Sequence, residues 1–255
     1  MPAALERLFV EGVQAQKAGE LDTAERLFLK VLRQGGKVAY VYNNLGAVYQ
    51  MRGDHARAIA RFRDAVRLQP NYAAPRILMG ASLLALGRVP EATRELERAV
   101  QLQPREPLAR QQLAKAYERA DNFPGLVEQF RALREIAPQE PEYAYQLGRA
   151  YLELAGWCVR EMARVNSRSA RVYQARAENY RALGHLERAV QVFQRAVQAD
   201  PKLPDLHLAL AGIYLEQGKQ AEARQEIEQE LAIVPESVAA LALKKRLEAA
   251  GTRPK

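Results

Sequence analysis

Residues 39–72 read AYVYNNLGAVYQMRGDHARAIARFRDAVRLQPNY and contain two amphipathic stretches. The dipeptide Gly53-Asp54 separates the two stretches, and Pro70 follows the second. Glycine permits the positive φ that commonly closes a helix, and proline cannot continue a helix interior. The segment therefore predicts one helix–turn–helix unit.

The same pattern recurs along the chain with a period of 34 residues. The turn positions hold Gly19, Gly53, Gly87, Asp121, and later Gly184 and Gly218. The terminating prolines are Pro70, Pro104, Pro138, and later Pro201 and Pro235. A fixed period of this length is typical of stacked helical units, each of which buries its apolar face against its neighbours.

Small and large residues alternate in a way that favours close helix packing. Gly46 and Ala58 would let the two helices of their unit approach, and Leu45, Tyr49 and Phe62 would fill the space beside that contact. The small and large positions of the second helix recur in other units. The pairs are Ala24 and Phe28, Ala58 and Phe62, Ala92 and Leu96, Ala189 and Phe193, and Ala223 and Ile227.

The unit at residues 39–72 resembles the tetratricopeptide repeat family. The resemblance rests on Tyr42, Leu45, Gly46, Tyr49, Gly53, Ala58, Phe62, Ala65 and Pro70, and it extends over about residues 5–250. It implies an all-α fold, a right-handed α-solenoid of seven stacked helix–turn–helix repeats with a C-terminal capping helix. It also implies a non-enzymatic protein–protein interaction scaffold or adaptor.

The expected division follows the period. Residues 1–140 hold four repeats, 141–169 a shortened irregular repeat, 170–237 two repeats, and 238–255 the capping helix and tail. Asp121 and Gly184 are 63 residues apart, five fewer than 34 plus 34. An apolar stripe runs through the gap from Ala144 to Val165 in steps of three and four. We therefore predict one long helix at about residues 142–166, where the array changes its pitch, with a tight kink at Gly156 as the alternative.

Composition excludes several classes of protein. Hydrophobic residues make up 48% and charged residues 27%, as in folded globular chains. No apolar run approaches the ~18 residues that cross a bilayer, so no membrane insertion is expected. The N-terminus shows no export signal, which predicts a cytoplasmic protein; a periplasmic location stays open if a signal has been removed.

The sequence offers no metal or cofactor site, so neither is expected. Cys158 is the sole cysteine, and the three histidines are far apart and are interpreted as turn or helix-surface residues. The histidines are His55, His185 and His207. The acidic cluster of Glu222, Glu226, Glu228 and Glu230 is interpreted as a solvated helix face.

Neither catalysis nor nucleic-acid binding is expected. Phosphate-binding loops and hydrolase motifs are missing from the sequence, and repeats occupy the chain from end to end. The net charge of +8 is spread along the chain rather than gathered in a tail. Arginines at four-residue spacing are interpreted as solvated faces, with a docking patch as the alternative. They are Arg57, Arg61, Arg160, Arg164 and Arg168.

The resemblance implies that the first helices of the repeats line a concave peptide-binding groove. The candidate groove residues are Asn43, Asn44, Leu78, Gln111, Gln112, Lys115, Gln146 and Arg149. Amide side chains suit a peptide backbone because they both donate and accept hydrogen bonds. Lys115 and Arg149 would receive acidic side chains or a free carboxylate of a protein or peptide partner.

Two alternatives to this peptide-binding groove concern the same helices. Family members that clamp a C-terminal carboxylate use five positions, of which Asn44 alone agrees here; Phe9, Val13, Ala74 and Leu78 occupy the others. That subfamily is not expected. The alternative function is a structural assembly or homo-oligomerisation module that works through its convex face or its ends, which the apolar Phe9 and Val10 favour.

Overall fold

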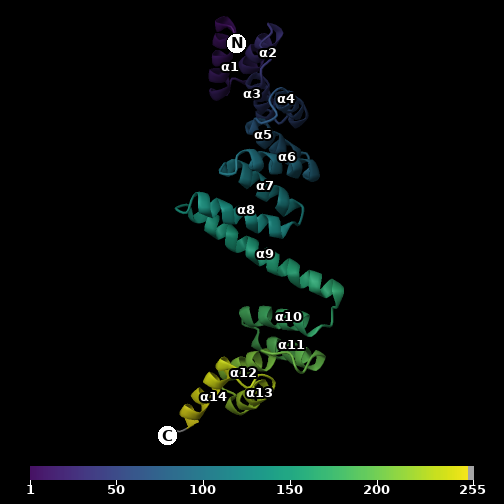
Figure 1. The fold of residues 1–255 in the computed structure, drawn as a ribbon, viewed down its shortest axis with the longest axis vertical. Helices are drawn as coiled ribbons and strands as arrows, with labels where there is room; N and C mark the ends of the chain where they lie inside the picture. Colours follow the sequence, from purple (N-terminus) through teal and green to yellow (C-terminus); the bar gives the residue numbers. More distant parts are fainter. Residues whose placement is uncertain (252–255) are drawn as a thin grey trace. The chain divides into compact units, whose positions relative to one another are not determined.

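Helices in the N-terminal part of the chain pack as consecutive pairs joined by tight turns (Figure 1). The computed structural model describes residues 1–251, which form fourteen α-helices and no strand. The first four pairs are α1 (Ala3–Lys17) with α2 (Leu21–Arg33), α3 (Ala39–Met51) with α4 (His55–Leu68), α5 (Ala73–Ala85) with α6 (Val89–Leu102), and α7 (Pro107–Arg119) with α8 (Phe123–Ile136). The fold is therefore all-α, as predicted.

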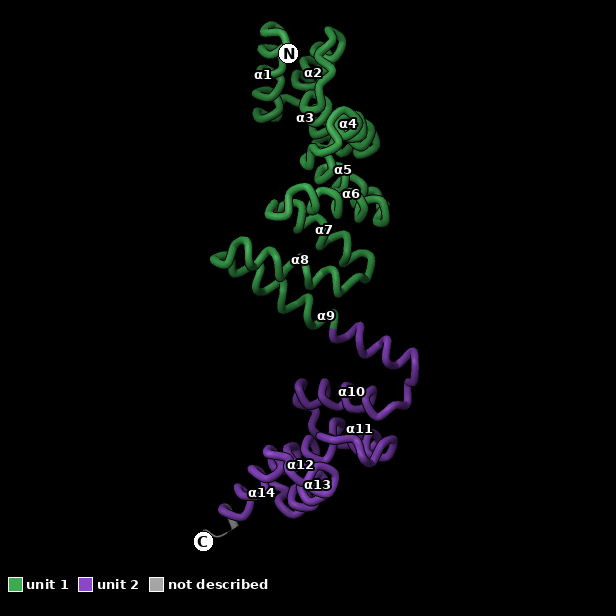
Figure 2. The backbone as a smooth tube through the Cα atoms, in the orientation of Figure 1, with its two compact units in different colours: residues 1–154 green, residues 155–255 purple. Residues whose placement is uncertain are grey.

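The chain divides into two units, Met1–Leu154 and Ala155–Lys255 (Figure 2). The second unit contains two further pairs and a last helix. They are α10 (Ala170–Ala182) with α11 (Leu186–Ala199), α12 (Leu206–Glu216) with α13 (Gln220–Ile233), and α14 (Val238–Gly251), which packs on α13. Each unit has its own buried core.

One helix differs from all the others in length. Helix α9 (Pro141–Val165) has 25 residues and contains the boundary between the two units. Gly156 lies inside it without ending it. The division into seven repeats and the change of pitch at this place stay predictions.

The turns within the pairs use left-handed backbone conformations. Gly53 has a φ of 76°, and the backbone N–H of Asp54 donates to the carbonyl of Tyr49 at 2.9 Å. Asp121 adopts the same region, with a φ of 52°, at the position where other pairs have glycine. Asp54 then caps α4, because its carboxylate accepts a 3.0 Å hydrogen bond from the N–H of Arg57.

A glycine and a large side chain fit together inside the first three pairs, where Gly12, Gly46 and Gly80 lie against Phe28, Phe62 and Leu96. A β-carbon on Gly46 would lie 2.6 Å from the ring of Phe62, and one on Gly80 would lie 2.4 Å from Leu96. Phe62 and Leu96 are fully buried. The two helices therefore approach closely, as predicted, because a large side chain of one packs directly against a glycine of the other.

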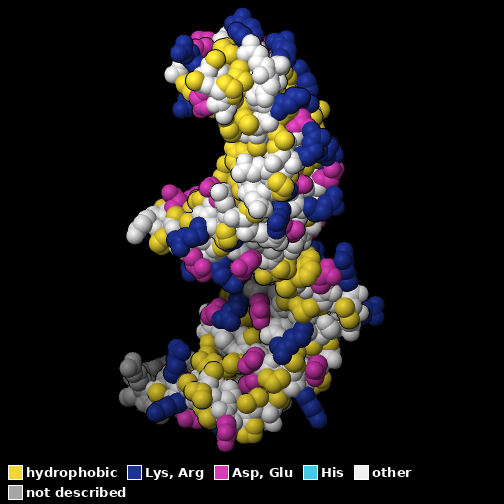
Figure 3. Space-filling view, turned by 45° about the horizontal axis from the view of Figure 1, so that its top comes forward, with side chains coloured by type: hydrophobic (Ala, Val, Ile, Leu, Met, Phe, Trp, Pro, Cys, Tyr) yellow, Lys and Arg dark blue, Asp and Glu magenta, His cyan; other side chains and the backbone are white. Residues whose placement is uncertain are grey.

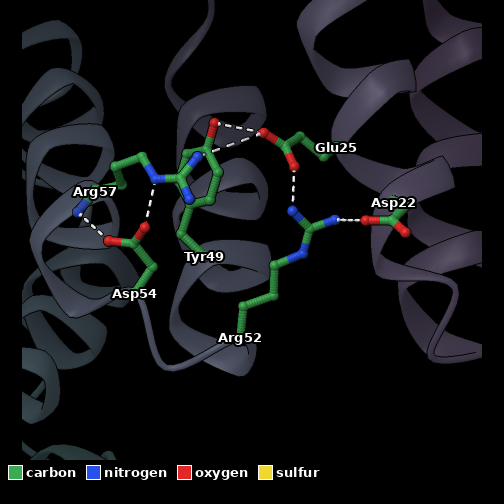
Figure 4. A network of polar contacts seen from close by, with 6 residues as sticks. All are labelled: Asp22, Glu25, Tyr49, Arg52, Asp54 and Arg57. Carbon is green, nitrogen blue, oxygen red and sulfur yellow. Dashed lines mark hydrogen bonds and ion pairs between the residues drawn. The ribbon is translucent and has the colours of Figure 1, made fainter.

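A polar network joins neighbouring pairs at the surface (Figure 4). The hydroxyl of Tyr49 on α3 donates a 2.9 Å hydrogen bond to Glu25 on α2. Arg52 bridges Glu25 and Asp22, and the guanidinium of Arg57 lies 4.6 Å from the centre of the Tyr49 ring. These contacts fasten α2, α3 and α4 together.

His207 and Glu230 of the C-terminal unit were wrongly interpreted as surface residues, whereas Glu222 and Glu228 of the acidic cluster are exposed as expected. His207 is 9% exposed, and its Nδ1 lies 2.6 Å from a carboxylate oxygen of Glu226. Glu230 is fully buried and accepts hydrogen bonds from the N–H groups of Asp205 and Leu208, at 2.9 and 3.3 Å. These side chains are not solvated, because α12 covers this face of α13 and Glu230 satisfies free N–H groups at the start of α12.

Charges of both signs occur together over the described surface. On the face drawn in Figure 3, basic side chains lie next to acidic ones on both units. Arg61 pairs with Asp64 at 3.1 Å and Arg164 with Glu161 at 2.8 Å, so each of these two arginines has a carboxylate neighbour on its own helix. None of the helices formed by residues 1–251 has the length and apolar character needed to cross a membrane.

Candidate functional site

A cavity of about 330 Å³ opens between α7, α8 and α9 in the N-terminal unit. Its lining combines charged, amide and apolar side chains from these three helices. The lining residues are Gln111, Ala114, Lys115, Glu118, Leu126, Phe130, Glu142, Tyr143, Gln146, Arg149, Ala150 and Glu153. The cavity therefore lies between the last pair of the N-terminal unit, α7 with α8, and the long helix α9.

Earlier in the chain, the equivalent place is closed by a hydrogen-bonded side chain. Between α3 and α5, the amide of Gln50 donates to the hydroxyl of Ser82 and to the carbonyl of Leu78, both at 2.9 Å. Ser82 is fully buried. The two helices are thus joined by polar groups that satisfy one another.

The residues at these two positions change from one repeat to the next. One period later the pair of residues is Leu84 and Ala116, both buried in the apolar core. A further period later it is Glu118 and Ala150, and both line the cavity. Glu118 has no amide N–H to donate and Ala150 has no hydroxyl to accept, so no equivalent bond can close this place.

The amide groups of the cavity are held by specific partners. Gln111 Nε2 on α7 donates a 2.9 Å hydrogen bond to the hydroxyl of Tyr143 on α9. Gln146 Nε2 donates to Glu142 at 2.6 Å, and its oxygen accepts from Arg149 at 3.3 Å. The tyrosine hydroxyl accepts in this arrangement, so its own hydrogen can be donated to a bound group.

The charges of the cavity are mixed. Lys115 from α7 and Arg149 from α9 contribute positive charge, and Glu118, Glu142 and Glu153 contribute negative charge. Lys115 is exposed and takes part in none of the ion pairs formed by residues 1–251. Its ammonium group is therefore the cation most available to a ligand.

The structure brings half of the predicted groove residues together. Those that line the cavity are Gln111, Lys115, Gln146 and Arg149. Those that do not are Asn43, Asn44, Leu78 and Gln112. Asn43 is 9% exposed, and its side-chain oxygen has no hydrogen-bond partner. Asn44 donates a 2.8 Å hydrogen bond to the carbonyl of Tyr40 one turn earlier in α3.

Several residues that line the cavity were not predicted from the sequence. Glu118 follows Lys115 by three residues and Glu153 follows Arg149 by four, so each shares a helix face with a predicted residue. That spacing could have predicted that Glu118 and Glu153 line the same site as Lys115 and Arg149. Phe130 occupies the large position of its second helix, and nothing in the sequence shows that it also borders a cavity.

Family models match most of the repeats. Two models described as tetratricopeptide repeat match the sequence, one at residues 49–116 and 180–247 and the other at residues 9–73. The first alone spans more than half of the chain. This chain belongs to the tetratricopeptide repeat family.

Solved structures of tetratricopeptide repeat (TPR) proteins share this fold. The C-terminal part of a TPR repeat-containing protein from Cytophaga hutchinsonii has a TM-score of 0.53 and 16% identity, covering 92% of this chain and 98% of that one. A tetratricopeptide repeat protein from Parabacteroides merdae has a TM-score of 0.52 and 16% identity, covering 96% and 98%. A search of curated proteins gave no match.

A further match is a longer protein. A chain of the APC/C hetero-tetramer Cut9–Hcn1 has a TM-score of 0.47 and 18% identity, with 94% of this chain covered. This TPR chain spans 42% of that protein's length. The similarity to the Cytophaga hutchinsonii and Parabacteroides merdae structures, at 16% identity, shows the fold alone.

The TPR architecture makes this protein a protein–protein interaction scaffold. Stacked helical repeats offer extended surfaces to partners rather than a closed catalytic pocket. Within residues 1–251, no cluster of three or more His, Cys, Asp or Glu side chains is placed to hold a metal ion.

Proposed function

We propose that the protein binds an extended peptide segment of a partner along α7 and α9, with the cavity as the centre of the site. The observation that carries this proposal is the space left between Glu118 and Ala150, beside the unpaired Lys115. A cavity lined by a few convergent polar groups and an apolar floor is the usual form of a binding site. Leu126 and Phe130 would supply that floor.

The polar groups suit a peptide that carries a carboxylate. Lys115 and Arg149 would receive an acidic side chain or a free C-terminus, since charge-assisted hydrogen bonds are the stronger ones. The oxygen of Gln111 and the hydroxyl hydrogen of Tyr143 would bond the peptide backbone. Glu118 and Glu153 would repel a second carboxylate, which would favour an isolated acidic group over an acidic run.

A phage-displayed random peptide library, selected against the purified protein, tests this function. We expect enriched peptides to contain one acidic residue or to require their free C-terminus, and Lys115→Ala to weaken their binding about tenfold. Arg67→Ala is the matched control, because Arg67 is an exposed cation on α4 away from the cavity. The proposal fails if selected peptides bind the Lys115→Ala and Arg149→Ala variants as they bind wild type.

The second candidate function is assembly. Phe9 does not support it as first expected, because its ring packs 5.7 Å from that of Phe28 and 4.8 Å from that of Tyr40. Val10 is 45% exposed. The apolar surface that favours assembly lies instead on α9.

A further inference from the structure

Helix α9 has lost the partner that every comparable helix possesses. In the regular pairs that have glycine at this position, the residue sixteen positions later covers it, as Phe62 covers Gly46 and Leu96 covers Gly80. At the equivalent Gly148 no atom lies within 4 Å of the place where a β-carbon would stand. The shortened repeat therefore leaves one face of α9 without its second helix.

The uncovered face is apolar over several turns. Tyr145 is 62% exposed and Leu152 is 75% exposed, and Ala155 is also exposed. With Gly148 they lie at steps of three and four residues, which places them on one stripe of the helix. Exposed large apolar side chains grouped in this way mark an interaction surface rather than ordinary surface residues.

We propose that this face binds the α9 helix of a second copy of the chain, in antiparallel orientation. With the two-fold axis near residue 150, Gly148 of each copy lies opposite Leu152 of the other. Tyr145 then lies opposite Ala155. Each large residue meets a small one, as in the regular helix pairs, and two-fold symmetry makes every contact twice.

Charges beside the stripe agree with the same register. Arg149 of each copy lies close to Glu153 of the other. In a parallel pair, each of these residues would instead lie beside the same residue of the second copy, and the like charges would repel. Opposite charges that flank an apolar seam are the feature that selects orientation in paired helices.

The interface can be separated from the proposed peptide site. Tyr145 and Leu152 line no part of the cavity, whereas Arg149 and Glu153 do. Substitution of Leu152 therefore tests assembly and leaves the cavity walls intact. Failure of one proposal would not imply failure of the other.

Light scattering after size exclusion, over a micromolar to near-millimolar range, measures the association. We expect the mass of the wild-type protein to rise toward that of a dimer with concentration, and Leu152→Glu to weaken this association at least about tenfold. The matched control is Leu183→Glu, which changes a residue 63% exposed on another element and should leave the association unchanged. A circular dichroism spectrum shows whether each variant is folded.

A charge exchange tests the register. Arg149→Glu alone should weaken the dimer, because it would lie near Glu153 of the second copy, and the double variant Arg149→Glu with Glu153→Arg should restore it. The proposal is overturned if the wild type stays monomeric at all concentrations. It is also overturned if the wild-type protein dimerises but the Leu152→Glu variant dimerises equally well. A double variant whose dimer is as weak as that of Arg149→Glu alone would overturn it too.

Discussion

The hydroxyl of Tyr117 donates a 2.8 Å hydrogen bond to a carboxylate oxygen of Glu97, twenty residues earlier on the preceding helix pair. The second unit repeats this relationship, since Gln194 Nε2 donates to the Tyr214 hydroxyl at 3.4 Å, again over twenty residues. The tyrosine of the repeat therefore fastens neighbouring pairs, in addition to filling space within its own.

The first prediction concerns the pH dependence of stability. Burial and the hydrogen bond to Glu97 raise the pKa of Tyr117 to about 12, from 10.0 for an unperturbed tyrosine. The folded protein thus holds this proton more tightly than the unfolded chain. The contribution of Tyr117 is fully present below about pH 10 and is lost as the pH rises through 12.

Urea unfolding at a series of pH values checks this prediction. The difference in unfolding free energy between wild type and Tyr117→Phe should be constant up to about pH 9 and should shrink above pH 10. Tyr145→Phe is the control, because Tyr145 is exposed. A difference that stays constant from pH 9 to pH 12 would show that Tyr117 is not protected by the fold.

The second prediction compares two glycines at the same repeat position. Gly46→Ala should destabilise the protein by about 1–3 kcal/mol, because the new methyl group would stand against the buried Phe62 ring. Gly148→Ala should stabilise it by up to about 1 kcal/mol, since alanine is the better helix former and nothing stands near. Thermal melts of dilute protein check both. Equal effects of the two substitutions would contradict the loss of a partner helix at α9.

The helix pairs could be predicted from the sequence because their determinants are local. Gly53 and Pro70 mark a turn and a helix end by their own backbone chemistry, and Gly46 and Phe62 recur at fixed spacing. His207 and Glu230 were misjudged for the opposite reason. The helix faces that carry these two residues have a polar sequence pattern. The sequence of one helix does not show which neighbouring helix covers it.

The candidate site was half predictable on the same grounds. Lys115 and Arg149 follow from the repeat register, which fixes the positions that face the groove. The cavity beside them depends on what fills the seam between two helices. Glu118 and Ala150 stand where Gln50 and Ser82 stand two periods earlier, and the hydrogen bond between Gln50 and Ser82 is visible only in the folded chain.

The third prediction concerns the buried glutamate of α13. Glu230→Ala would leave the N–H groups of Asp205 and Leu208 without an acceptor, and unsatisfied buried donors cost about 1–3 kcal/mol each. The C-terminal unit should therefore melt at a lower temperature. Glu222→Ala is the control, because Glu222 is exposed on the same helix and should change stability little. Similar melting of both variants would exclude a capping role for Glu230.

The last prediction asks whether the cavity can be closed with residues that the protein already uses elsewhere. Glu118→Gln together with Ala150→Ser would recreate on α7 and α9 the hydrogen bond that Gln50 makes to Ser82. The new amide would occupy the space between the helices, so peptides selected on wild type should bind the double variant about tenfold more weakly.

Neither Lys115 nor Arg149 is altered, and the net hydrogen bond should add about 1 kcal/mol of stability. Glu118→Gln alone is the control: it removes the same charge but can form only the equivalent of the Leu78 bond, to the carbonyl of Gln146, so it should close the cavity less than the double variant does. Isothermal titration of a selected peptide against the three proteins decides the matter. If the double variant binds as well as the single one, the peptide does not enter the cavity, and Lys115 and Arg149 bind it from outside.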